Sequence, residues 1–150
     1  MSRASEEMIN GSGGKLFVRS WLTESAPRAA VVAICHGFNA HSGMHQWAGQ
    51  QLSEHGLSAF AVDLRGRGRS EGERFYTTSI DDYVQDGQAL IALAKVRHRE
   101  CPIFLLGHRA GGVTSCIYAL DYEKDLAGRF AKASPSSFPL LVLRSPRSRR

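Results

Sequence analysis

A short glycine-rich turn carries the clearest chemical signal in this sequence of 150 residues. The turn Gly107–Gly112 reads GHRAGG and lies between the apolar runs Pro102–Leu106 and Val113–Leu120. Between a strand and a helix, its first and last glycines allow a cramped turn that lifts the middle side chain above the sheet. The helix that follows directs backbone N–H groups at any oxyanion formed there. The pattern therefore has the shape of a nucleophile elbow.

Two further loops place polar groups where apolar runs end. His36–Asn39 (HGFN) follows Ala29–Cys35, and the loop beginning with Asp63–Ser70 (DLRGRGRS) follows Leu57–Val62. Ligands of open parallel sheets bind at the carboxyl ends of the strands, so we expect the three loops to meet. The first loop is then placed to supply a second oxyanion donor.

The segments between these loops alternate between strand and helix patterns. Continuous apolar runs are typical of parallel strands covered on both faces, and apolar residues at 3.6-residue spacing indicate helices. We expect an antiparallel hairpin in residues 7–21, a turn at Glu24–Pro27, strands at Ala29–Cys35, Leu57–Val62 and Pro102–Leu106, and helices at Met44–His55, 80–96 and from Val113 to Leu120. This order predicts an α/β fold with a mostly parallel sheet and flanking helices.

The three loops together resemble those of the α/β-hydrolase superfamily, in its monoacylglycerol lipase, lysophospholipase and serine aminopeptidase (S33) branch. The resemblance covers roughly residues 8–128 and implies that backbone N–H groups of Phe38 and Ala110 form an oxyanion hole. It implies cleavage of a small-molecule ester or lipid through an acyl-enzyme, with no cofactor or metal. The elbow and loop motifs that carry it contain His36, Gly37, Gly107, His108, Gly111 and Gly112.

Three departures from the family pattern predict an inactive chain. Arg109 stands where the nucleophilic serine is expected, and a guanidinium is not a nucleophile. The family order is Ser, then Asp or Glu, then His, but all 6 histidines precede Arg109. The last acid, Asp125, lies too close to the elbow to follow a later strand. Ser115 is a poor substitute because no histidine is available to activate it.

The charge is uneven along the chain. The chain has 19 Lys and Arg residues and a net charge of +5. Residues 129–150 contain six of these basic residues and no Asp or Glu. We therefore divide the chain into the N-terminal part of a truncated hydrolase domain (1–128) and a basic Ser/Pro/Arg-rich tail (129–150), disordered or out of frame. If the codons from Arg129 onward are read in a shifted frame, they can encode a strand-like segment that continues the fold. Pro102–Leu106 is then expected at an apolar sheet edge.

Other readings of the sequence remain open. Arg109 suits a non-catalytic anion-binding module, and the tail suits nucleic-acid binding, although we expect no specific nucleic-acid partner. We interpret the loop arginines as solvated, His41, His45 and His55 as surface or loop histidines, and Cys35, Cys101 and Cys116 as buried reduced thiols. We expect no membrane span and a cytoplasmic location. The oligomeric state is left open.

Overall fold

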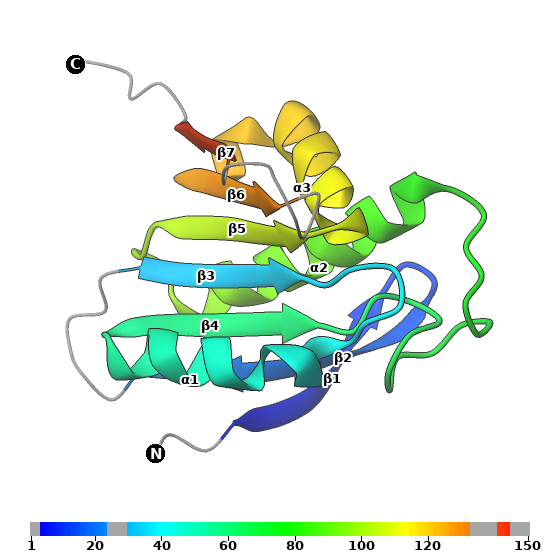
Figure 1. The fold of residues 1–150 in the computed structure, drawn as a ribbon, viewed down its shortest axis with the longest axis horizontal. Coiled ribbons are helices and arrows are strands. Elements are labelled where there is room, and N and C mark those ends of the chain that lie inside the picture. Colours follow the sequence, from blue (N-terminus) through cyan, green and yellow to red (C-terminus); the bar gives the residue numbers. More distant parts are fainter. Residues whose placement is uncertain (1–3, 24–29, 133–140, 145–150) are drawn as a thin grey trace.

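A single mixed sheet organises the molecule (Figure 1). The computed structural model describes residues 4–23, 30–132 and 141–144, so the predicted turn at Glu24–Pro27 lies outside the described residues. The elements are β1 (Ser5–Gly11), β2 (Gly14–Trp21), β3 (Ala30–Cys35), η1 (Ser42–His45), α1 (Gln46–Glu54), β4 (Leu57–Val62), α2 (Ile80–Arg97), β5 (Ile103–His108), α3 (Ala110–Asp121), η2 (Glu123–Asp125), β6 (Gly128–Lys132) and β7 (Leu141–Arg144).

The sheet has 7 strands in the order β1-β2-β4-β3-β5-β6-β7. Strands β4, β3, β5 and β6 run parallel, whereas β1, β2 and β7 join them through antiparallel pairs. The expected hairpin and the parallel strand–helix alternation are both confirmed. Because β3, β4 and β5 are parallel neighbours, the loops that follow them emerge from the same end of the sheet.

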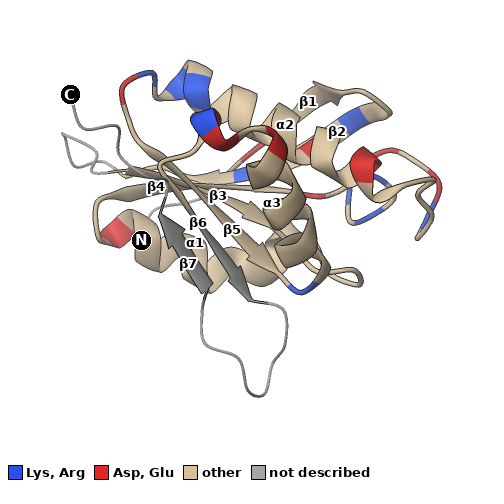
Figure 2. Ribbon diagram, turned by 90° about the horizontal axis from the view of Figure 1, so that it is seen from above, with Lys and Arg blue, Asp and Glu red and all other residues tan. Residues whose placement is uncertain are grey.

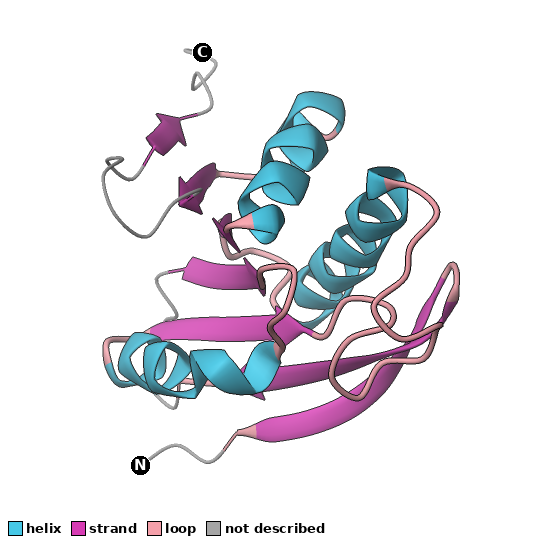
Figure 3. Cartoon of the chain, turned by 45° about the vertical axis from the view of Figure 1, so that its right-hand side comes forward, coloured by secondary structure: helices cyan, strands magenta, loops and turns pink. Residues whose placement is uncertain are grey.

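The two faces of the sheet pack against different helices (Figure 3). Helix α1 covers the face that contains Trp21, Ile34 and Ala61. Gly49 is required in α1 because a Cβ there would collide with the Trp21 indole ring. Helices α2 and α3 cover the opposite face and enclose the larger core, which includes Val31, Ala33, Phe60, Leu90, Ile91, Leu105 and Tyr118.

Helix α2 begins where the sequence predicts. The Ser79 side chain accepts from the backbone N–H of Asp81, and the Asp82 carboxylate accepts from the Ser79 backbone N–H, which forms a capping box. Arg65 ties this helix to the loop after β4 through hydrogen bonds to the buried Asp86 and an ion pair with Asp82. The capping box and the contacts of Arg65 together fix the start of α2 and its orientation across the sheet.

The boundaries of the elbow differ from the prediction. The turn expected over Gly107–Gly112 is confined to Arg109, because β5 continues to His108 and α3 starts at Ala110. Strand pairing explains the longer strand, since Gly107 is aligned with Cys35 of β3. The short turn leaves one residue to reverse the chain direction.

The expectation that Pro102–Leu106 forms an apolar edge of the sheet is wrong. β6 pairs parallel with β5, and β7 pairs antiparallel with β6. The β5 segment is therefore an inner strand rather than the apolar edge expected from the sequence, because Phe104–His108 is aligned with Gly128–Lys132. The division at Gly128 and the shifted reading frame stay predictions.

Candidate functional site

Arg109 alone forms the turn between β5 and α3. Its backbone has φ 55 and ψ −117, a conformation that L-residues adopt only when the surroundings enforce it. The side chain is exposed at the carboxyl end of the sheet. The structure therefore gives residue 109 the strained, projecting conformation that the glycine-rich turn predicts.

Close backbone packing explains why glycines flank this turn. A Cβ at Gly107 would collide with the carbonyl oxygen of Gly111, and one at Gly111 would collide with that of Cys35. A Cβ at Gly37 would lie only 3.2 Å from the Cβ of Arg109 and 3.2 Å from the carbonyl oxygen of His108. The elbow and the His36–Asn39 loop are thus in direct contact, as the sequence predicts.

His36 holds the first loop from inside the protein. Its Nε2 accepts from the backbone N–H of Leu64 at 3.0 Å, so the proton is assigned to Nδ1, which donates to the Gly37 carbonyl at 2.6 Å. Burial lowers the pKa of this ring, which favours the neutral form that both bonds require. His36 therefore has a structural role and connects the loops after β3 and β4.

Asp63 joins the same two loops through its carboxylate. One oxygen accepts from the backbone N–H of Ser42 at 2.6 Å, and the other accepts from that of Arg69 at 2.9 Å. The Ser70 hydroxyl donates to the backbone carbonyl of Asp63 and accepts from the backbone N–H of Phe17 at 2.8 Å. These contacts fix the loop after β4 as part of the site scaffold.

Arg67 supports the first loop of the candidate site, which the sequence did not predict. Interpreted as a solvated loop residue, it is in fact only 2% exposed. Its Nε donates to the carbonyl oxygen of Phe38 at 2.6 Å, and its guanidinium lies 4.6 Å from the Phe38 ring centre and 4.9 Å from that of Phe75. The alternation of arginine and glycine in this loop shows nothing of this burial.

The other arginines of this loop also form hydrogen bonds or ion pairs. Arg65 is largely buried against Asp86, whereas Arg69 is exposed and pairs with Glu6. Arg74 donates to three backbone carbonyls of the same loop, those of Gly68, Ser70 and Gly72. Figure 2 shows basic and acidic segments interspersed along the loops beside β1 and β2. Arg69 and Arg74 are therefore exposed to solvent, as expected, whereas the prediction is wrong for the buried Arg67 and for Arg65.

A cavity of about 430 Å³ lies above the contact between the elbow and the first loop. Its lining combines apolar and basic side chains: Gly37, Phe38, Asn39, Ala40, Met44, His45, His108 and Arg109. None of these described lining residues is an acid. The predicted site residues Gly37, Phe38, His108 and Arg109 are thus brought to one cavity.

His45 is more enclosed than the expected surface histidine. It lines the cavity, and its ring meets that of His108 edge-on with centres 6.4 Å apart. Burial lowers the pKa of His45 to about 4, with smaller contributions from His36, His108 and His41. At neutral pH its ring is uncharged and able to accept or donate a hydrogen bond.

The remaining candidate side chains lie elsewhere. Ser115 is fully buried beneath the elbow, where its hydroxyl would collide with a Cβ at Gly107, so it does not face the cavity. Cys35 is buried and burial raises its thiol pKa to about 12, whereas Cys101 and Cys116 are only half-buried. His41 and His55 are exposed, as expected.

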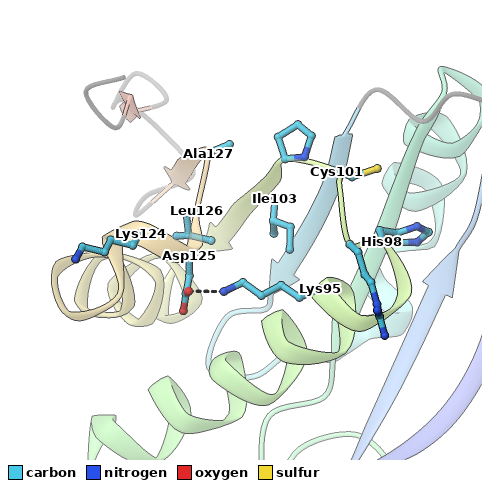
Figure 4. Close-up of a pocket in the computed structure, with 10 residues that line it drawn as sticks. Lys95, His98, Cys101, Ile103, Lys124, Asp125, Leu126 and Ala127 are labelled. Carbon is cyan, nitrogen blue, oxygen red and sulfur yellow. Dashed lines mark hydrogen bonds and ion pairs between the residues drawn. The ribbon is translucent and has the colours of Figure 1, made fainter. Parts of the chain in front are cut away.

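A second cavity, of about 440 Å³, opens at the opposite end of β5 (Figure 4). Lys95 and Asp125 form an ion pair across it, and Asp125 also accepts from the Tyr118 hydroxyl at 3.1 Å. The cavity lies at the start of β5, next to Ile103, and contains none of the predicted site residues. Residues of α2 and the residues just before β6 line this cavity, and the elbow residues do not.

Two other kinds of feature are absent from the described segments. Within residues 4–23, 30–132 and 141–144, no group of three or more His, Cys, Asp or Glu side chains is arranged to hold a metal ion. Over the same part of the chain, no helix combines the length and the apolar character needed to cross a membrane.

The chain is similar to curated proteins of one kind. It is 32% identical to a monoacylglycerol lipase of Mycolicibacterium smegmatis over 94% of this chain and 52% of that protein. It is also 32% identical to a human monoglyceride lipase, over 94% of this chain and 44% of that protein. The chain thus spans about half the length of the curated relatives it matches.

Solved structures show which fold the chain has. A carboxyl esterase from Bacillus coagulans superposes with a TM-score of 0.76 at 19% identity, covering 86% of this chain and 44% of that chain. The profile of the serine aminopeptidase S33 family matches residues 26–140, which include all three loops of the site. The chain therefore belongs to the serine aminopeptidase S33 family and has the α/β-hydrolase fold.

Proposed function

We propose that this chain keeps the ligand cavity of an ester hydrolase but does not hydrolyse esters. The observation that carries the proposal is Arg109, which occupies the strained elbow position with φ 55 at the edge of the cavity. Its guanidinium stays protonated and cannot attack a carbonyl carbon. Loss of an elbow serine costs on the order of 10⁶ in kcat in a serine hydrolase.

The proposed ligands are small esters or lipids. The names of the relatives, monoacylglycerol lipase and monoglyceride lipase, support this class. The cavity itself supports it through Phe38 and Met44, which present apolar surface beside Arg109. Backbone N–H groups of Phe38 and Ala110 would donate hydrogen bonds to the carbonyl oxygen of such a ligand, as they would in an oxyanion hole.

Hydrolysis assays test the proposal directly. Purified protein is incubated with p-nitrophenyl esters and with a fluorophosphonate probe, and the Mycolicibacterium smegmatis relative provides the positive control. We expect neither turnover nor labelling from this chain. Labelling of any serine would contradict the proposal.

The variant Arg109→Ser adds a second test. It restores a hydroxyl at the elbow, but no histidine follows position 109 in this sequence to activate it. We expect labelling to stay at background. If the Arg109→Ser variant were labelled and a His45 substitution abolished that labelling, His45 would act as the base. The parent chain would then lack only the nucleophilic serine.

A second candidate function is anion binding without chemistry. It is favoured by the absence, among the described residues, of any hydrogen bond or ion pair to the Arg109 guanidinium, although the side chain lines the cavity. An exposed guanidinium at a concave site is suited to a carboxylate or phosphate. Titration calorimetry with both anions tests this function, and binding that survives Arg109→Ala would contradict it.

A further inference from the structure

We infer that the cavity beside Arg109 binds amphiphilic carboxylates, with the carboxylate on the guanidinium and the apolar chain along Phe38 and Met44. This inference rests on the proposed function, because it requires a residue 109 that binds rather than reacts.

The position of the Arg109 stem supports the carboxylate end of the site. A Cβ at Gly37 would lie 3.5 Å from the Cδ of Arg109, so the stem crosses the glycine of the first loop. In the part of the chain that the structure describes, no acid pairs with its guanidinium. A charged group that lines a cavity without a protein partner is available to a ligand.

His45 lines the same cavity and adds no charge to it at pH 7, because burial lowers its pKa to about 4. Its Nε2 is enclosed by protein and has no hydrogen-bond partner among the described residues, so we place no ligand contact on that atom. Arg109 is the one arginine or lysine among the described residues that line the cavity. A single guanidinium matches a single carboxylate better than a doubly charged phosphate.

The apolar part of the site is formed by two exposed side chains. Phe38 is 52% exposed and Met44 is 65% exposed, and both line the cavity. Trp47, one helical turn after Met44, is 74% exposed. Large apolar side chains left in water next to a basic cavity favour a ligand that carries an apolar chain. Inorganic anions would leave these contacts unused.

Calorimetric titration of the full chain distinguishes these ligand classes. The probes are octanoate, butyrate, 1-octanol and inorganic phosphate, at neutral pH and low salt. We expect octanoate to bind more tightly than each of the other three. Binding of phosphate as tight as that of octanoate, binding of 1-octanol as tight as that of octanoate, or no binding of octanoate would each overturn the inference.

Two pairs of variants locate the ligand. We expect Arg109→Gln to weaken octanoate binding about tenfold, whereas the control Arg69→Gln, in the neighbouring loop, leaves it unchanged. We expect Met44→Ser to weaken octanoate binding about threefold with little effect on butyrate, whereas the exposed Val96→Ser on α2 has no effect. Circular dichroism confirms that each variant is folded, and an unchanged affinity in Arg109→Gln would overturn the inference.

Failure of this inference is separable from failure of the proposed function. Octanoate contains no ester bond, so its affinity is measured independently of turnover. Hydrolysis of p-nitrophenyl octanoate would refute the absence of activity, while the octanoate titration would still report on the carboxylate site. A protein that neither hydrolyses esters nor binds octanoate would keep the proposed inactivity and lose only the ligand assignment.

Discussion

Arg67 and Phe38 are joined by two interactions across 29 residues of sequence: the Nε of Arg67 donates to the Phe38 carbonyl oxygen at 2.6 Å, and its guanidinium lies over the Phe38 ring. The loop after β4 therefore fixes the loop after β3 at the residue that faces the cavity. The Phe75 ring is also close to this guanidinium, at 4.9 Å. A buried cation in contact with aromatic rings holds the edge of the site in place.

We predict that Arg67→Met lowers the free energy of unfolding by about 2 kcal/mol. The substitution keeps an apolar side chain of similar length but leaves the Phe38 carbonyl without its donor and removes the cation–π contacts. Urea denaturation measures the change. The matched control is Arg69→Met in the same loop, where an exposed ion pair with Glu6 and an exposed cation–π contact with Phe17 are lost and the expected effect is below about 1 kcal/mol. Equal effects for the two variants would argue against a special role for Arg67.

We predict opposite effects for two glycine-to-alanine substitutions. Gly111→Ala places a Cβ against the carbonyl oxygen of Cys35, so we expect a loss of about 2–4 kcal/mol from steric strain. Gly87→Ala in α2 places a Cβ 3.7 Å from the Cys35 sulfur, an ordinary contact, and we expect a gain of about 0.5–1 kcal/mol from helix propensity. Thermal and urea unfolding measure both. A neutral Gly111→Ala would mean that β3 and α3 are not in close contact.

Backbone strain at the elbow gives a third prediction. Arg109 has φ 55, a value that glycine adopts more readily than other residues. We expect Arg109→Gly to raise the free energy of unfolding by about 1 kcal/mol relative to Arg109→Ala, which keeps a Cβ and hence the strain. Comparing these two variants separates the backbone effect from the loss of the side chain. Equal stability of the two would show that the turn is relaxed.

The enclosed ring of His45 gives a fourth prediction, for acid pH. Its pKa is lowered to about 4 in the folded protein, chiefly by burial, so the unfolded chain binds a proton more readily. The stability that this neutral ring supports is present above about pH 6.5 and is lost as the pH falls from 6.5 toward 4. We expect His45→Gln to reduce this loss between pH 6.5 and 4, as followed by urea unfolding at each pH.

Other histidines define the controls for that measurement. His36, whose pKa burial also lowers, remains in the His45→Gln variant, so part of the acid sensitivity should persist. His41 and His108 also contribute to the lowered pKa of His45. The exposed His55 lies at the end of α1, and His55→Gln should leave the pH dependence unchanged. A pH profile of His45→Gln identical to that of the parent would show that the ring is exposed to solvent.

The sequence by itself determined the parallel strands, the capped helix α2 and the position of the elbow, because these depend on apolar runs, a local capping box and glycine spacing. It also showed that residue 109 is an arginine and that no histidine follows it. Such features are local, so neighbouring residues are enough to specify them.

Only the tertiary structure decided which loop arginines are buried, where His45 lies and that β5 has neighbours on both sides. Arg65, Arg67 and Arg69 alternate with glycine or serine in one short loop, yet they pair with Asp86, Phe38 and Glu6, which come from different elements. Burial of a charged side chain depends on partners that the fold brings together from distant parts of the chain. No local pattern around an arginine contains that information.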